Sequence, residues 1–448
     1  PAKVHFSIRS FSKITMRRAA LLALATAMLA TACRSEPPVT VPSYEATMRW
    51  ATDRIVRSLP ASRLAGQLIM VGIENDADGR PLLSLDAAHR DLLERVQPGA
   101  AVLFGQTFSG VAQVRALVAE LDAAVAVPPI VATDYEGGLV SRLTTTGGIP
   151  ATPIPPAEVV GRAVAAATGA APPDGIALAR RLGEVMGREL RALGVTMNFA
   201  PVADVDPPEG TGAIGRHGRT YGADPVFVGA VAAAVAEGLQ REGVAAVVKH
   251  FPGHGAVAED SHDELPVLAA DAAAWRSREA LAFAGALAGR PAGLMTAHLA
   301  VPGVTGDPMP ATLSARASLL ARRDIGFAGL LVTDALNMRA LEAIAPEPEL
   351  VVRAIEAGND FVLKPLDPAA AHEAILAALA SGRLPRARLE ASVRRIFRAK
   401  RALGILGGPN GLARPRGVTL PADPGSILGS AGHRAVVDRI AELAGGSN

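Results

Sequence analysis

Residues 244–250 are Val-Ala-Ala-Val-Val-Lys-His, five apolar residues followed directly by a lysine and a histidine. A short apolar run rich in β-branched residues is typical of a strand buried on both faces. Three of the nine histidines fall between Lys249 and Pro266, in a loop marked by Gly and Pro. Loops held by a rigid scaffold often have a catalytic or binding role. The stretch therefore predicts a buried strand that ends in a functional loop.

The same alternation of apolar run and amphipathic segment extends along the chain in both directions. The predicted strands are Gly66–Ile73, Gly99–Phe104, Pro128–Asp134, Val195–Ala200, Val244–His250, Ala292–His298, Gly329–Asp334 and Asn359–Lys364. The predicted helices are Tyr44–Ser58, Leu85–Val96, Val111–Val125, Ile176–Leu193, Pro225–Glu242, Asp271–Ala288, Leu313–Arg323, Glu347–Ala357, Pro368–Ala380 and Pro385–Leu403. The segment Val164–Asp174, rich in Ala, Gly and Pro, is predicted to be an irregular excursion.

Eight apolar strands that alternate with helices predict a parallel sheet covered on both faces. Over more than three hundred residues this pattern favours the α/β class and a TIM-type (β/α)₈ barrel, a single catalytic domain with a short C-terminal extension. A doubly wound open sheet is the alternative. No Gly-rich phosphate-binding fingerprint follows the first strand, so a dinucleotide-binding form of that alternative has no support.

The chain of 448 residues is predicted to divide into three parts. Residues 1–43 form a leader and tether, residues 44–405 the catalytic barrel, and residues 406–448 a linker with a short helix at His433–Leu443. About forty residues are too few for a second domain. The tail is expected either to pack on the barrel or to stay loose.

The leader resembles an export signal. Met16-Arg17-Arg18 is positively charged, Ala19–Ala30 is an apolar segment too short to span a bilayer, and small residues precede Cys33. This is similar to a bacterial lipoprotein signal, so we expect a periplasmic or cell-envelope location and anchoring to the membrane by a lipid on Cys33. Cys33 is the one cysteine, which excludes an intrachain disulfide and a cysteine metal cluster.

The net charge of +2, without a long basic run in the body of the chain, argues against nucleic acid as the main partner. We expect no cofactor and no metal. His250 and His254 are spaced as HxxxH, but in a Gly/Pro loop and not on the helix that zinc hydrolases use. A serine hydrolase is disfavoured because no G-x-S-x-G motif is present.

Polar residues end most of the predicted strands. In a (β/α)₈ barrel the carboxyl ends of the strands meet at the catalytic face. Asp334, at the end of the seventh strand, is a rigidly held carboxylate suited to nucleophilic attack. Asp260 and His262 offer a carboxylate–histidine pair for proton transfer, because a histidine with a fixed tautomer can donate and then accept a proton. The other strand-end groups are Asp134, Asp204, Lys249, His250, His298 and Lys364.

Several motifs together resemble the β-N-acetylhexosaminidases of glycoside hydrolase family 3, over roughly Ala61–Leu403. They are Lys249-His-Phe-Pro-Gly-His-Gly255 with Asp260-Ser-His262, Thr133-Asp134-Tyr-Glu136-Gly-Gly-Leu-Val-Ser-Arg142, Ala200-Pro-Val-Ala-Asp204, Arg219-Thr-Tyr-Gly-Ala-Asp-Pro225, Met295-Thr-Ala-His298 and Thr333-Asp334-Ala-Leu-Asn-Met338.

The resemblance implies a retaining hydrolase of terminal β-linked N-acetylglucosamine, acting on muropeptides or chitin-like fragments. Asp334 would form the glycosyl-enzyme, His262 would be the acid/base, and Asp260 would orient it. The resemblance also implies that the terminal sugar is held by Asp134, Arg142, Arg219, Lys249 and His250.

The sequence departs from the family pattern at two places. Ala256 stands where the family often has Asp, and the loop Gly215–Arg219 is altered, which leaves Arg216 as a rival to Arg219. His254 is expected to be a structural residue that shapes the turn. Two other functions stay open: a β-N-acetylglucosaminide phosphorylase on the same scaffold, and a non-catalytic glycan-binding envelope lipoprotein.

Overall fold

The computed structural model describes residues 44–144, 146–168, 174–207, 209–210, 212–259, 265–407 and 420–445. The predicted leader and Cys33 lie outside these residues. Backbone contacts divide the chain into residues 1–49 and residues 50–448, and the barrel lies wholly in the second unit. Within the described ranges, no helix combines the length and the apolar character needed to cross a membrane.

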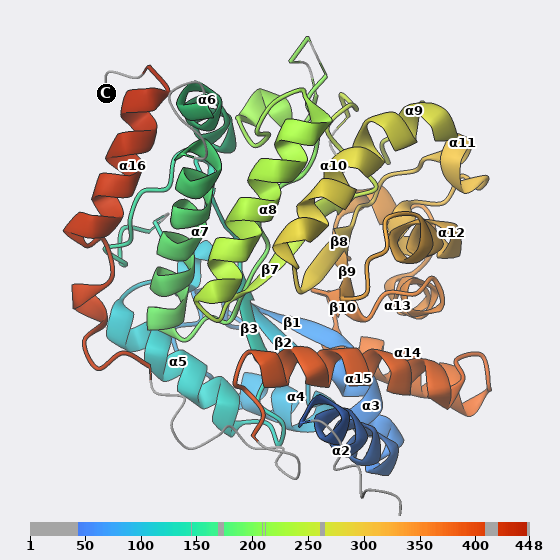
Figure 1. Cartoon of the computed structure of the whole chain (residues 1–448). Helices are drawn as coiled ribbons and strands as arrows, with labels where there is room; N and C mark the ends of the chain where they lie inside the picture. Colours follow the sequence, from blue (N-terminus) through green and yellow to red (C-terminus); the bar gives the residue numbers. More distant parts are fainter. Residues whose placement is uncertain are drawn as a thin grey trace, which may run out of the picture. The chain divides into compact units, whose positions relative to one another are not determined.

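Eight parallel strands form a closed barrel in chain order, surrounded by helices (Figure 1). They are β1 (Ile69–Ile73), β2 (Ala100–Leu103), β3 (Ile130–Thr133), β6 (Met197–Asn198), β7 (Ala245–Phe251), β8 (Gly293–Thr296), β9 (Leu330–Ala335) and β10 (Phe361–Leu363). The barrel closes because β1 pairs with β2 on one side and with β10 on the other, with Ile69 opposite Val362. The (β/α)₈ prediction is confirmed, and the open-sheet alternative is wrong.

Helices connect the strands and cover the outside of the barrel. The α-helices are α2 (Tyr44–Ser58), α3 (Ala61–Gln67), α4 (Ala87–Val96), α5 (Val111–Ala123), α6 (Ala157–Thr168), α7 (Asp174–Leu193), α8 (Pro225–Arg241), α9 (Ala272–Ser277), α10 (Glu279–Ala286), α11 (Pro302–Thr305), α12 (Ala315–Leu319), α13 (Glu347–Glu356), α14 (Pro368–Ala380), α15 (Arg386–Ala402) and α16 (Ala431–Leu443). The shorter single-turn elements are η1 (Gly105–Thr107), η2 (Gly215–His217), η3 (Leu287–Gly289), η4 (Ala311–Leu313), the π-helical η5 (Leu320–Asp324), η6 (Arg339–Leu341) and η7 (Pro424–Ser426).

Aspartate side chains cap the N-termini of four of the described helices. Asp86, Asp224, Asp271 and Asp367 each accept hydrogen bonds from backbone N–H groups of the first turn. In α8 and α14 a proline follows directly, where its missing N–H costs nothing and its fixed φ suits the helix. Such caps are worth about 1 kcal/mol each. They explain why several predicted helix starts lie within two residues of the observed ones.

Aromatic packing anchors the end of β7. The buried Phe251 ring meets Trp275 of α9 and Phe283 of α10 edge-on, at centroid distances of 6.2 and 5.4 Å. Trp275 Nε1 donates a 2.9 Å hydrogen bond to the carbonyl of Pro252. The chain directly after Lys249 and His250 is therefore held rigidly against the helical layer.

The structure differs from the sequence prediction at several places, among them the four that follow. Residues 164–168 belong to helix α6, because their alanines favour helix in spite of the neighbouring Gly and Pro. Residues 66 and 67 complete helix α3, so β1 begins only at Ile69. The helix predicted at 271–288 is broken at Arg278, whose backbone is not helical. A small hairpin, β4 (Tyr135–Gly137) with β5 (Val140–Ser141), follows β3 and was not predicted.

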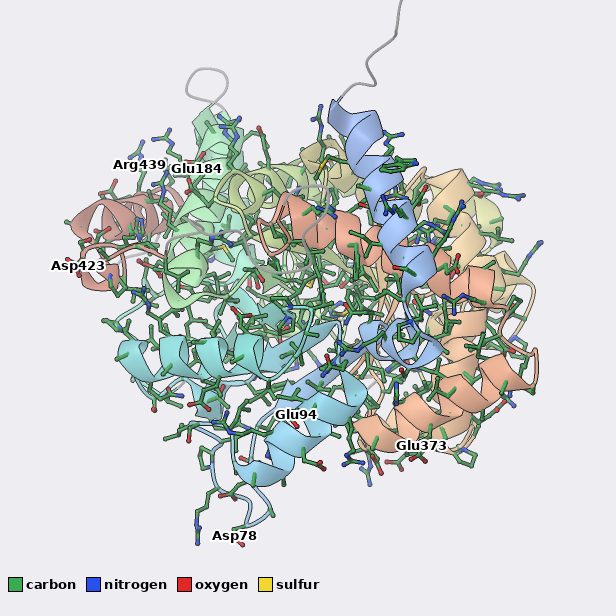
Figure 2. All side chains as sticks on the ribbon, turned by 90° about the horizontal axis from the view of Figure 1, so that it is seen from below. Asp78, Glu94, Glu184, Glu373, Asp423 and Arg439 are labelled. Atoms are coloured by element: carbon green, nitrogen blue, oxygen red, sulfur yellow. The ribbon has the colours of Figure 1, made fainter. Side chains whose placement is uncertain are left out.

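The C-terminal helix α16 packs beside α6 and α7 (Figure 1). Ser430 caps α16, and the helix buries His433 and Ile440. Arg439, on its other face, is exposed, as are Glu94 of α4 and Glu373 of α14 (Figure 2). His433 Nδ1 lies 2.9 Å from Oε1 of the buried Glu189 on α7. The described part of the tail, residues 420–445, thus packs on the barrel.

Glu189 also connects α7 to the strand end that bears Asp134. Its Oε2 lies 3.0 Å from the Tyr135 hydroxyl and accepts a 2.9 Å hydrogen bond from the backbone N–H of Thr152. Its Oε1 accepts from the Thr152 hydroxyl and from the backbone N–H of Gly429. Burial opposes ionisation, but the hydrogen bonds, that from His433 first, lower the pKa of Glu189.

Candidate active site

A pocket of about 520 Å³, lined by charged and apolar side chains, opens at the carboxyl ends of the barrel strands. Each of the eight strands contributes a side chain near its end. They are Glu74 after β1, Phe104 after β2, Asp134 after β3, Phe199 after β6, Lys249 and His250 in β7, Met295 in β8, Asp334 in β9, and Lys364 after β10. This is the face at which (β/α)₈ barrels place their chemistry.

A buried ion cluster forms one wall. Lys249 Nζ lies 2.9 Å from Asp134 Oδ1 and 2.6 Å from Glu136 Oε1. Arg219 donates two hydrogen bonds to the carboxylate of the same Glu136, at 2.9 Å from Nε and 2.8 Å from an Nη atom. Burial raises the pKa of Glu136, but the positive charges of Lys249 and Arg219 outweigh it and bring the value down to about 2. Glu136 is therefore ionised at neutral pH.

Glu136 was not among the predicted site residues. It is quoted in the motif Asp134-Tyr-Glu136, but no periodicity distinguishes it from a loop carboxylate. The hairpin β4–β5 explains its position, because it turns the chain so that Asp134 and Glu136 both reach Lys249. The carboxylate of Glu136 fixes the guanidinium of Arg219, which lines the pocket.

The structure separates the two arginines of the altered loop. Arg219 lines the pocket and is largely buried. Arg216 is exposed, and its Nη1 donates to the carbonyl of Ala258 at 3.1 Å, away from the pocket walls. The geometry supports Arg219 as the pocket residue. Arg142 lines the pocket too, with its Nε 3.7 Å from Asp134 Oδ2.

His250 is fixed by Asp204. Its Nδ1 lies 2.6 Å from Asp204 Oδ2, and its backbone N–H donates to the same carboxylate. Asp204 is fully buried, which raises its pKa, but the adjacent His250 and His254 outweigh that and lower it. An ionised Asp204 holds the proton of His250 on Nδ1 and leaves Nε2 for the pocket. Asp204 was noted as a strand-end carboxylate but not assigned to the site.

Asp334 lies on the pocket wall at the end of β9, with one carboxylate oxygen, Oδ1, accepting a 2.8 Å hydrogen bond from the N–H of Ala335. Burial raises its pKa, but the charges of His298, His250 and Lys249 lower it below the ordinary value. His298 Nε2 lies 2.9 Å from the Ala335 carbonyl and so supports the backbone beside Asp334. An ionised carboxylate on a rigid strand end can act as a nucleophile.

A second ion pair forms the opposite wall. Lys364 Nζ lies 2.7 Å from Glu74 Oε1 and 4.4 Å from the centroid of the Phe104 ring. These groups end the first, second and last strands of the barrel, so this wall exists only when the barrel is closed. Lys364 was noted as a strand-end group, whereas Glu74 was missed because it directly follows β1 without a motif.

The predicted acid/base pair, Asp260 and His262, lies outside the described residues. The chain is described again from Leu265, and up to Glu259 on the other side. The described residues thus bring together Asp334 and all five predicted sugar-binding residues in one pocket, Asp134, Arg142, Arg219, Lys249 and His250. Within the same described ranges, no three His, Cys, Asp or Glu side chains are grouped as metal ligands.

Comparisons with known proteins identify the family of the chain. A protein-family model, that of the glycosyl hydrolase family 3 N-terminal domain, matches residues 63–399. The β-hexosaminidase of Nitrosospira multiformis is 34% identical over 305 residues, which cover 68% of this chain and 82% of that protein.

Two solved structures are similar to the whole barrel. A glycoside hydrolase family 3 β-N-acetylglucosaminidase from Paenibacillus sp. str. FPU-7 has a TM-score of 0.75 and 33% identity, covering 86% of this chain and 69% of that one. A β-glucoside phosphorylase has a TM-score of 0.74 and 25% identity, covering 91% and 68%. The family match spans most of the chain and includes every pocket residue described above. The chain therefore belongs to glycoside hydrolase family 3, and it is an enzyme of that family.

Proposed function

We propose that this enzyme is an exo-acting β-N-acetylhexosaminidase. It would remove terminal, non-reducing β-linked N-acetylglucosamine from muropeptides or chitin-like oligosaccharides. The observation that carries the proposal is the ionised Asp334, on a pocket wall shared with a charged cluster, at the carboxyl ends of the strands. The names of the similar proteins support the choice of sugar.

The proposed reaction is a double displacement with retention. An oxygen of Asp334 attacks the anomeric carbon while the bond from that carbon to the leaving oxygen breaks. His262 gives its proton to the leaving oxygen. His262 then takes a proton from water, the water oxygen attacks the anomeric carbon, and Asp334 is released. Asp260 would orient His262; the roles of this pair rest on the sequence motif.

The charged wall would hold the sugar. Lys249 and Asp134 form a salt bridge at the pocket surface and present a donor and an acceptor side by side, which suits adjacent sugar hydroxyls. His250 offers its Nε2, and Arg142 and Arg219 offer further N–H donors. Because neighbouring carboxylates fix several of these groups, they need not be reorganised when the sugar binds.

Phosphorolysis is the second candidate function. The observation that favours it is the similarity of the chain to a β-glucoside phosphorylase. A histidine acid/base would tolerate an anionic nucleophile better than a carboxylate would. A glycan-binding protein without turnover is the third candidate, and the ionised Asp334 in the pocket argues against it.

One product analysis separates the three. The purified full-length chain is incubated with 4-nitrophenyl N-acetyl-β-glucosaminide, chitobiose and muropeptides, with and without phosphate. We expect free N-acetylglucosamine, first released as the β-anomer, with a yield that phosphate does not change. N-Acetylglucosamine 1-phosphate as the main product would refute the hydrolase, and binding without turnover would refute both enzymatic candidates.

We further propose that the protein is exported and anchored to the cell envelope by a lipid on Cys33. The support is the signal-like segment at residues 16–33. Incorporation of labelled palmitate by the wild-type chain, lost in Cys33→Ser, is the expected result. Labelling that persists in this variant would contradict the anchor.

A further inference from the structure

The side chain of His254 lines the pocket and is almost completely buried. The His254 ring is 1% exposed and lines the pocket beside His250 and Asp334. Among the residues that the structure describes, neither its Nδ1 nor its Nε2 has a hydrogen-bond partner. The His250 ring meets it edge-on at a centroid distance of 6.0 Å.

The backbone of His254 already has a structural role that needs no imidazole. Its N–H donates a 2.7 Å hydrogen bond to Asp204 Oδ1, the carboxylate that also fixes His250. The turn itself is set by the two flanking glycines. A Cβ on Gly253 would lie 2.4 Å from Glu279 Cγ, and one on Gly255 would lie 2.1 Å from the Val205 carbonyl oxygen.

These contacts hold the backbone of His254 beside the pocket. Both flanking residues are packed against neighbouring chain, and the backbone between them is tied to Asp204. A buried polar group without a partner costs the folded state a free energy equivalent to roughly 10- to 100-fold in an equilibrium constant. An apolar side chain would shape the same turn without that cost, so the ring nitrogens call for a partner beyond the residues that the structure describes.

The charge state of the ring indicates the kind of partner. Burial first, and then the neighbouring His250, lower the pKa of His254. At neutral pH the ring is therefore uncharged, with one N–H donor and one nitrogen lone pair. An uncharged group that both donates and accepts, such as a hydroxyl or an amide, satisfies this ring. A phosphate or carboxylate offers acceptors only.

We propose that His254 is a substrate-binding residue that hydrogen-bonds an uncharged polar group of the sugar in the pocket, either a ring hydroxyl or the acetamido group. This inference rests on the proposed function, because it takes the sugar to be N-acetylglucosamine. His254 would thereby contribute to sugar specificity: a pocket built around a hydrogen-bonding group rejects an analogue that lacks its partner.

The test is a cycle between enzyme and substrate variants. Wild type, His254→Ala and His254→Asn are assayed on 4-nitrophenyl N-acetyl-β-glucosaminide, on its 3-, 4- and 6-deoxy analogues, and on the analogue without the acetamido group. His217→Ala is the matched control, because His217 is an exposed histidine of η2 that does not line the pocket. Circular dichroism and thermal midpoints check that each variant is folded.

With wild type and with His217→Ala, we expect kcat/KM for one analogue to be about 10- to 100-fold lower than for the parent substrate. With His254→Ala, kcat/KM for that analogue should be almost the same as for the parent substrate. That analogue identifies the group that His254 contacts. If every analogue loses the same factor in wild type and in both His254 variants, the proposal is overturned. His254→Asn keeps a polar side chain but leaves the position of Nε2 empty, so it provides the measurement should the alanine variant fail to fold.

The cycle also separates this inference from the proposed function. Wild type that turns over no N-acetylglucosaminide refutes the hydrolase proposal, and the same cycle is then measured as calorimetric binding of N-acetylglucosamine and its deoxy analogues. Coupling between His254 and one sugar group in binding would support the inference even so. Additive losses there, or no binding at all, would overturn it.

Discussion

His433 Nδ1 lies 2.9 Å from Oε1 of Glu189, a fully buried carboxylate on α7, so helix α16 is tied to the barrel by a hydrogen-bonded pair. We expect His433→Ala to lower the free energy of unfolding by about 1–3 kcal/mol, because a buried carboxylate oxygen loses a donor. Urea unfolding at pH 7 measures it. Arg439→Ala, on the exposed face of α16, should change stability by less than about 0.5 kcal/mol. Equal effects of the two substitutions would contradict the pair's role.

Glu136 should make part of the stability acid-sensitive. Its folded-state pKa of about 2 lies below the ordinary value of 4.5. Its contribution is therefore present above about pH 4.5 and is lost as the pH falls toward 2, with a total on the order of 3 kcal/mol. The gap in stability between wild type and Glu136→Gln, from urea unfolding at pH 7, 4.5 and 3, should narrow as the pH falls. A gap that stays constant or widens would show that the cluster does not hold Glu136 ionised.

Arg219 and Arg216 should respond differently to the same conservative change. Arg219→Lys loses the two-pronged contact with Glu136, since a lysine ammonium cannot reproduce a guanidinium fork. We expect kcat/KM on the aryl N-acetylglucosaminide to fall by about 10- to 100-fold. Arg216→Lys, on the exposed residue of the same loop, should stay within about twofold of wild type. The reverse order would assign the pocket role to Arg216.

Asp334→Asn should abolish turnover. The amide cannot form the glycosyl-enzyme, so we expect kcat to fall by at least about 10³-fold while the fold is kept. Asp324→Asn, an exposed carboxylate just before β9, is the control and should remain active. A slow fluorinated N-acetylglucosaminide should label the wild-type chain on the peptide that contains Asp334, detected by mass spectrometry. Label on another residue would move the nucleophile elsewhere.

His262→Ala should slow poor leaving groups more than activated ones. An acid catalyst matters most when the departing oxygen is strongly basic. Across aryl N-acetylglucosaminides with leaving-group pKa values from about 4 to about 10, log(kcat/KM) should fall more steeply for the variant than for wild type. Parallel slopes would count against the acid role, and His217→Ala should keep the wild-type slope.

The sequence predicted the barrel well because its strands are buried on both faces. Runs such as Val244–Val248 and Leu330–Val332 are continuous and apolar, and polar residues mark where they end. The hairpin β4–β5 could not be found in this way, since strands of three and two residues show no period. Helix α6 was not predicted, because Ala-rich segments near Gly and Pro resemble loops in composition alone.

The site could be predicted only where chemistry repeats a recognisable motif. Asp334, Lys249 and His250 stand in such motifs, and they line one pocket. Glu136 and Glu74 are ordinary carboxylates in sequence, and only the three-dimensional contacts with Lys249 and Lys364 distinguish them. Likewise, the unpartnered nitrogens of His254 are a property of its surroundings that no sequence pattern expresses.

The closure of the barrel also sets an order of events during synthesis. Ile69 of β1 pairs with Val362 of β10, which is synthesised nearly three hundred residues later. The Glu74–Lys364 pair is likewise separated by 290 residues of sequence. Contacts between such distant segments form late and make folding slow. The ribosome must release almost the whole barrel before this wall of the pocket exists. A nascent chain that ends before β10 has Asp334 and Lys249 in its sequence but no finished pocket in which to use them.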